Sequence, residues 1–159
     1  MMNFEKYTNS SKKIINSAQN LALSKKHQKI APIHIFNELL NSNHELINKI
    51  FEKINTGIIK TTVSEILSKE QVNNSNSSQI YADPKLLSLF EGAEKIAKSN
   101  QDSFVSIDSL FLSCIKSDDQ IENILKKMGS VLDWLKQKYK SSEKMENLKA
   151  KILMIILTL

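Results

Sequence analysis

Residues 30–40 read IAPIHIFNELL, and residues 105–115, a shift of 75 positions away, read VSIDSLFLSCI. The two segments share apolar positions: Ile30, Ile35, Phe36 and Leu40 correspond to Val105, Leu110, Phe111 and Ile115. Upstream, the same shift relates Ala18, Leu21, Ala22 and Ser24 to Ala93, Ile96, Ala97 and Ser99. Because the order of the expected helices and the lengths of the loops match as well, we interpret the chain as a duplication.

Apolar residues at helical spacing continue outward from both segments. They predict four helices in each half, with stripes that include Ile14, Phe36, Ile47 and Val63 in the first half and Phe90, Phe111, Ile124 and Leu135 in the second. Thr8 or Asn9 is expected to cap the first helix, and Asp83 to start the fifth. We therefore predict an all-α fold without a sheet: eight helices in two four-helix repeats, related by a pseudo-twofold axis, with a seam between their first helices.

The chain is expected to divide into one double-repeat domain and a tail. Residues 1–140 form the domain, with repeat one at about 4–69, a linker at 70–80 and repeat two at about 81–140. The linker is polar and is expected to be mobile. Residues 141–159 are rich in lysine and then apolar, and they are too short to span a bilayer. We interpret this tail as the product of a truncation or frame shift; the alternative is a stand-alone domain whose tail docks on itself, a partner or a membrane surface.

Composition excludes several classes of protein. The 159 residues contain 3 Gly and 2 Pro, too few turn-forming residues for an all-β fold, and 1 Cys, which excludes a disulfide framework. The N-terminus lacks the apolar stretch of a signal peptide, so we expect a cytoplasmic protein without a membrane partner. The net charge of +5 is concentrated in residues 126–151, and all basic residues are Lys. Because Arg is the preferred residue for bidentate contacts to bases and phosphates, we expect no specific nucleic-acid partner.

The sequence contains no pattern typical of a catalytic or metal site. His27, His34 and His44 do not have the spacing of metal ligands, and His34 is expected to pack or cap at a helix start. Cys114 lies on an apolar helical face and is interpreted as a core residue. The three glycines are isolated, so there is no phosphate-binding loop. We expect no enzymatic activity, no metal and no cofactor.

Several segments resemble a known family. Residues 2–8 (MNFEKYT), 18–23 (AQNLAL), 30–40 and 102–111 (DSFVSIDSLF) resemble the Clp N-terminal domain, which has a double Clp-N motif. The resemblance covers about residues 2–140, and the wording at residues 32–34 (PIH) is closer to the ClpB disaggregase branch than to the ClpA or ClpC branch. The resemblance implies a fold made of two linked repeats, in a chain that lacks the ATPase modules of that family.

The resemblance also implies a function. It implies the substrate-engaging domain of a ClpB-like chaperone, which binds unfolded or aggregated polypeptide, with a ClpB-like hexamer and, indirectly, the DnaK system as further expected partners. Family residues important for this role fall on Thr8, Asp102 and Asp108, although Asp108 is one methylene shorter than the usual Glu. The alternative role for these residues is to hold helix ends.

The expected seam suggests where polypeptide binds. A shallow apolar groove is predicted between the first helices of the repeats, lined by Ile14, Ile15, Leu87 and Phe90. The alternative is that these four residues are ordinary core, as helical stripes usually are. Two other functions stay open: an adaptor-docking domain of the ClpA or ClpC type, and a basic helical module that binds nucleic acid through residues 126–151. Steep salt dependence would distinguish the nucleic-acid module.

Overall fold

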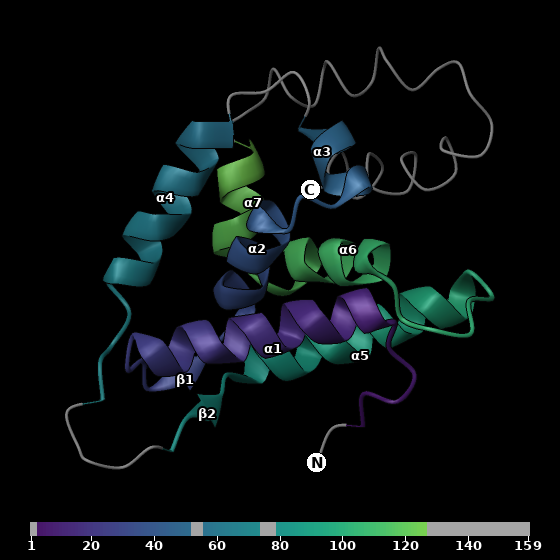
Figure 1. Cartoon of the computed structure of the whole chain (residues 1–159), viewed down its shortest axis with the longest axis horizontal. Coiled ribbons are helices and arrows are strands. Elements are labelled where there is room, and N and C mark those ends of the chain that lie inside the picture. Colours follow the sequence, from purple (N-terminus) through teal and green to yellow (C-terminus); the bar gives the residue numbers. More distant parts are fainter. Residues whose placement is uncertain (1–2, 52–55, 74–78, 127–159) are drawn as a thin grey trace.

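The computed structural model of the chain describes residues 3–51, 56–73 and 79–126 (Figure 1). Within these ranges the helices are α1 (Asn9–Ser24), α2 (Pro32–Asn41), α3 (Glu45–Ile50), α4 (Thr56–Ser68), α5 (Pro84–Ser99), α6 (Ile107–Ser117) and α7 (Asp119–Lys126), and the strands are β1 (Lys29–Ile30) and β2 (Tyr81–Ala82). The all-α class is confirmed. The eighth expected helix and the tail lie outside the described residues. No helix in the described ranges is long and apolar enough to cross a bilayer.

The first helix of each half has the same length and the same ending. α1 and α5 each contain 16 residues, and they start 75 positions apart. After each helix one residue adopts a left-handed conformation, Lys26 at φ 56° and Gln101 at φ 61°. The next residue then bonds back into the helix: the His27 N–H donates to the Ala22 carbonyl, and the equivalent N–H after α5 repeats this bond, both at 2.9 Å. This is a usual way to end a helix, and its repetition supports the duplication.

The centre of the core is formed by α2 and α6, the helices that follow the two segments quoted first. The rings of Phe36 and Phe111, which are equivalent positions, stack with centroids 6.4 Å apart. Phe51 meets Phe111 edge-on at 6.2 Å. The Cys114 thiol lies 3.5 Å from the Pro32 carbonyl oxygen, so the expected core role of Cys114 is confirmed.

The seam therefore differs from the expectation. The two halves meet mainly through α2 and α6 rather than through their first helices. The physical reason is burial: α2 and α6 are buried on most of their faces, whereas α1 and α5 each bury a single apolar stripe and expose the rest to water.

The expectation of a fold without a sheet is wrong. β1 and β2 pair in parallel, with Ile30 opposite Ala82. A second, single parallel bridge joins Tyr7 to Val105. The two pairings are related by the same shift of 75, and each joins one half to the other. Strands of two residues are too short to produce the alternating pattern by which strands are recognised in a sequence.

Part of the expected linker is hydrogen-bonded to the first half. The Gln28 N–H donates to the Gln71 carbonyl at 2.9 Å, and the Asn73 N–H donates to the Lys26 carbonyl at 2.7 Å. Between them, Val72 forms an antiparallel bridge with His27. Polar composition could not reveal these contacts, because backbone groups make them. Residues 74–78 lie outside the described residues.

Candidate functional site

Thr8 joins the start of α1 to the loop that precedes α6. Its hydroxyl oxygen accepts a hydrogen bond from the Ser11 N–H at 3.1 Å, so Thr8 is the N-cap of α1 as predicted. The Thr8 N–H donates to the Val105 carbonyl at 3.0 Å, and the buried Ser11 hydroxyl donates to the same oxygen at 2.9 Å. These bonds hold residues 102–108, here called the seam segment, against the first half.

The two aspartates implied by the family resemblance lie at the ends of the seam segment. Asp102 is exposed, and its N–H donates to the Ala97 carbonyl at the end of α5. Asp108 is partly buried in the first turn of α6, where a carboxylate interacts favourably with the helix dipole. The structure thus brings Thr8, Asp102 and Asp108 to one region. Their role in binding stays a prediction.

A hollow of about 510 Å³ opens on one side of the seam segment. It is called the Phe104 hollow and is lined by Lys6, Glu94, Ala97, Lys98, Asp102, Ser103, Phe104 and Val105. The Phe104 side chain is 53% exposed, which is unusual for a large aromatic residue. Sequence reasoning did not select Phe104, because it searched for helical stripes and Phe104 lies in a loop. The available signal was an aromatic residue outside any stripe.

A second hollow of about 350 Å³ lies beside the start of α6. It is called the Ile14 hollow and is lined by Ser10, Lys13, Ile14, Ser17, Glu38, Asn41, Ser42, His44 and Ile107. Its residues come from α1, from α2 and the turn that follows it, and from the first position of α6. Glu38 is partly buried, and this burial raises the pKa of its carboxyl. The hollow therefore combines mostly polar lining residues with a small apolar area from Ile14 and Ile107 and one partly desolvated acid.

The four residues of the predicted apolar groove are not brought together at these hollows. Only Ile14 lines one of them. Ile15 is buried on α1, and Phe90 is 3% exposed within an aromatic cluster, 5.2 Å from Phe4 and 6.2 Å from Tyr7 between ring centroids. Leu87 is 42% exposed on α5 and lines neither hollow. Ile14, Ile15 and Phe90 are all buried in the core, and the binding role of the four residues stays a prediction.

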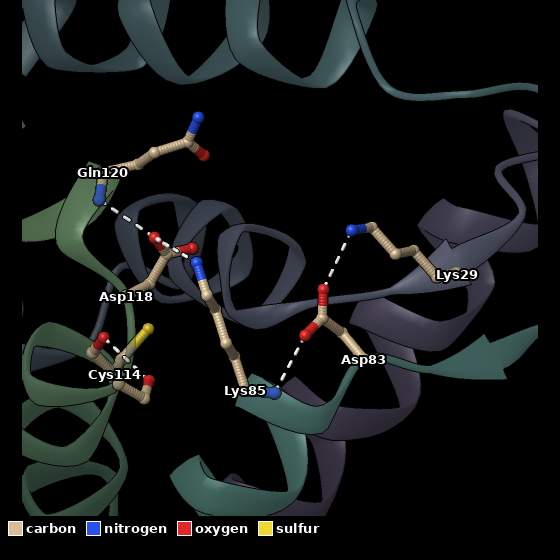
Figure 2. Close-up of polar contacts among 7 residues, drawn as sticks. Lys29, Asp83, Lys85, Cys114, Asp118 and Gln120 are labelled. Atoms are coloured by element: carbon tan, nitrogen blue, oxygen red, sulfur yellow. Dashed lines mark hydrogen bonds and ion pairs between the residues drawn. The ribbon is translucent and has the colours of Figure 1, made fainter.

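Charged residues connect β1 of the first half to the start of α5 in the second half (Figure 2). The Lys29 ammonium lies 2.9 Å from the Asp83 carboxylate, and Asp83 also accepts a hydrogen bond from the Lys85 N–H at the start of α5. Burial alone would raise the pKa of Asp83, but these partners outweigh it and lower the pKa. The Lys85 ammonium lies 4.0 Å from the buried Asp118. These contacts hold the helix ends in place.

Two histidines form a buried pair at the start of α2. His34 Nδ1 accepts a hydrogen bond from the Ala31 N–H at 3.0 Å, so the expected capping role of His34 is confirmed. His34 Nε2 must then carry the proton, which it donates to His27 Nδ1 at 2.9 Å. Burial lowers the pKa of both imidazoles, that of His34 to about 4. In the described part of the chain, no group of three or more His, Cys, Asp or Glu could hold a metal.

Comparison with known sequences identifies similar proteins. Residues 6–128 match the family model described as Clp repeat (R) N-terminal domain. The chain is 33% identical over 132 residues to the chaperone protein ClpB of Rhodopseudomonas palustris, covering 80% of this chain and 15% of that protein. It is 31% identical over 157 residues to the ClpB of Rickettsia conorii, covering 92% and 18%. The chain thus spans less than a fifth of the length of these relatives.

Solved structures share the fold. The Hsp104 N-terminal domain from Candida albicans has a TM-score of 0.73 at 20% identity, covering 94% of this chain and 90% of that chain. The N-domain of ClpV from Vibrio cholerae has a TM-score of 0.67 at 17% identity, covering 97% and 87%. At these identities the likeness establishes the fold alone.

Proposed function

The chain belongs to the Clp repeat N-terminal domain family, and on that premise we propose that it engages unfolded or aggregated polypeptide, as the N-terminal domain of a ClpB-like chaperone does. The proposal places it in the cytoplasm, as a binding module without ATPase activity of its own. Polypeptide binds at the seam segment, between the Phe104 hollow and the Ile14 hollow.

The exposure of Phe104 is the observation that carries this proposal. An aromatic side chain that is half exposed beside a hollow of about 510 Å³ offers apolar area to a ligand at little cost in side-chain entropy. The backbone next to it is held by the bonds from Thr8 and Ser11 to the Val105 carbonyl, so the ring is presented from an ordered frame.

The equivalent position in the first half supports a binding role for Phe104. A shift of 75 places Lys29 there, and Lys29 forms the ion pair with Asp83 that joins the halves. Phe104 cannot form an ion pair, and the residue equivalent to Asp83 is Thr8, which carries no charge. At this end of the seam the position is thus left available for a ligand.

Binding is expected to be weak. An unfolded chain loses conformational entropy when it is ordered on a surface, and the two hollows offer only a small apolar area. We expect a Kd in the micromolar range or weaker, which is suited to a module that samples many polypeptides.

The test is the substitution Phe104→Ser, with Leu87→Ser as its matched control. Both replace an exposed apolar residue in the second half, but Leu87 lines neither hollow. Binding of fluorescein-labelled, reduced and carboxymethylated α-lactalbumin is followed by fluorescence anisotropy. We expect Phe104→Ser to weaken binding about tenfold or more and Leu87→Ser to have little effect, with unfolding midpoints unchanged in both. Equal binding by Phe104→Ser and the unsubstituted protein would remove Phe104 from the site.

The same assay distinguishes the other two functions. With a labelled nucleic acid in place of the protein, a nucleic-acid module would show an affinity that falls steeply between about 50 and 200 mM salt, whereas the affinity of an apolar site for unfolded protein changes little. An adaptor-docking domain would bind a folded partner and show no saturable binding of the unfolded protein. The substitution Phe90→Ser is not a suitable probe, because Phe90 is buried against Phe4 and Tyr7 and its loss would destabilise the fold.

A further inference from the structure

The Ile14 hollow occupies a place that is closed in the other half. In the second half, Gly92 on α5 faces Ser113 on α6, and a Cβ atom added at Gly92 would clash with the Ser113 hydroxyl oxygen. That hydroxyl donates a hydrogen bond to the Leu89 carbonyl, which holds it in place. The small residues therefore let α5 and α6 pack in direct contact.

In the first half, the equivalent residues are larger. A shift of 75 relates Gly92 to Ser17 on α1, and Ser113 to Glu38 on α2. Both Ser17 and Glu38 line the Ile14 hollow. The glycine–serine contact that closes the second half is thus missing, and a space of about 350 Å³ remains beside α1 and α2.

Glu38 forms no ion pair with any of the described residues that line this space. Among the described residues, its carboxylate makes no hydrogen bond and no ion pair, and burial is the cause that raises its pKa. His44 cannot serve through Nδ1, which accepts from the Leu46 N–H as the cap of α3. Lys13 also lines the hollow but is exposed on α1. A partly desolvated carboxylate without a cation gains free energy when a cation arrives.

The walls of the hollow are apolar where Ile14 and Ile107 line it. A lysine or arginine side chain matches this arrangement, because its methylene stem packs on apolar surface while its charged end reaches a polar group. A bare divalent cation fits less well, since it needs several oxygen ligands and Glu38 supplies one carboxylate. We propose that the Ile14 hollow binds a lysine or arginine side chain of the engaged polypeptide, with Glu38 as its ion-pair partner. This inference rests on the proposed function and adds a charge preference to it.

Two synthetic peptides test the preference. The first is an acetylated and amidated heptapeptide with alternating alanine and leucine around a central lysine, and the second has norleucine, an uncharged analogue of similar shape, at the centre. Each is titrated into isotopically labelled protein at low salt, and Kd is obtained from the shifts of amide signals of α1 and α2. We expect the lysine peptide to bind about fivefold more tightly, a modest factor because the hollow is open to water.

Three variants test whether Glu38 causes the preference for the lysine peptide. Glu38→Gln keeps the shape and removes the charge, so it should bind both peptides equally. Glu91→Gln makes the same change of charge on an exposed position of α5, outside the hollow, and should keep the fivefold difference. The double variant Ser17→Gly/Glu38→Ser copies Gly92 and Ser113 of the other half and removes the carboxylate, so it should also lose the preference. Circular dichroism confirms that each variant is folded.

The outcomes separate this inference from the proposed function. Equal affinity of the unsubstituted protein for the two peptides, or a preference that survives Glu38→Gln, overturns the role of Glu38 while polypeptide binding stands. A preference that falls equally in Glu91→Gln shows a general effect of net charge and also overturns it. If neither peptide binds, both the inference and the proposed function at this surface fail.

Discussion

The two halves of the molecule share a backbone frame but differ in how closely their helices approach. α1 and α5 have the same length and the same left-handed ending, and Phe36 and Phe111 occupy equivalent places in the core. Yet Gly92 lets α5 contact α6, whereas Ser17 in the first half lines a hollow. Buried positions and helix ends thus preserve the frame, whereas the hollow is found where Ser17 and Glu38 replace the Gly92–Ser113 pair.

Exposed positions differ between the halves in a systematic way. Four exposed apolar residues, Leu23, Tyr81, Leu87 and Phe104, have a lysine at the equivalent position of the other half, namely Lys98, Lys6, Lys12 and Lys29. A lysine stem covers apolar surface much as an apolar side chain does, so either residue fits the same frame. At these four positions the exposed apolar side chain is therefore present in one half only.

The largest loss of stability is expected for substitutions at the core positions where the two halves are most alike. Phe111→Ala should lower the free energy of unfolding by about 3–5 kcal/mol, because it leaves a cavity at a fully buried position. Phe111 contacts two rings, those of Phe36 and Phe51, so we expect its loss to cost more than Phe36→Ala. Urea denaturation monitored by circular dichroism measures both. A loss below about 1 kcal/mol for either would show that α2 and α6 are not the shared centre of the core.

The second prediction is that the protein loses stability as the pH falls, because of two histidines that are found in the first half and not at the equivalent positions of the second. His27 and His34 are replaced by Asp102 and Ser109 at the equivalent positions. The pKa of His34 is about 4 in the folded chain and about 6.5 when unfolded, so its stabilising contribution is complete above about pH 6.5 and is lost as the pH falls towards 4. We expect a loss of about 2 kcal/mol between pH 7 and pH 5. His34→Gln should be less stable at pH 7 but should lose much less between these pH values; an unchanged pH dependence would contradict this role.

The third prediction, a smaller loss of stability, tests the close contact between Gly92 and Ser113 in the second half. Gly92→Ala places a Cβ atom against the Ser113 hydroxyl, and the resulting strain outweighs the better helix propensity of alanine, for a net loss of about 1 kcal/mol. Ser17→Ala, at the equivalent position, should be neutral or slightly stabilising. The double variant Gly92→Ala/Ser113→Ala removes the clash and should recover the stability. Thermal unfolding of all four proteins is the measurement, and a double variant no more stable than Gly92→Ala would refute the assigned contact.

The smallest loss of stability is expected at the Lys29–Asp83 ion pair, which joins the two halves. Lys29 is about half exposed, so Lys29→Ala should cost less than about 1 kcal/mol even though it removes the partner of Asp83. Asp83→Ala should cost more, because Asp83 also caps α5. Urea denaturation at low and high salt compares the two variants. A larger loss for Lys29→Ala than for Asp83→Ala would mean that the cap contributes little.

The helices could be predicted from the sequence because their signals are local. Apolar residues at helical spacing gave the stripes of α1 to α7, and Thr8 and Asp83 marked the starts of α1 and α5. The pairing of Tyr7 with Val105 gave no such signal, because single backbone bridges depend on contacts between distant segments. The position of the seam was missed for the same reason, since apolar periodicity identifies a buried face without identifying its partner.

The candidate site could be predicted only in part. The family resemblance located Thr8, Asp102 and Asp108, which the structure brings to one region. Apolar stripes instead selected Ile15 and Phe90, which are buried, because periodicity finds residues that face the core. A hollow depends on which residue faces another across the contact between two helices. Glu38 and Ser113 occupy equivalent positions but face different residues, and the sequence of one helix alone does not contain that information.

The reciprocal strand pairings have a consequence for how such a chain could arise. Ile30 pairs with Ala82 in the other half, and Tyr7 pairs with Val105 in return, so neither half completes its own edge. Two identical copies of a single ancestral repeat could make the same exchange about a true twofold axis, as a homodimer. Fusion of the two copies replaces association in solution by an intramolecular contact with an effective concentration in the millimolar range. The fold is then a dimer within one chain, freed from dependence on protein concentration.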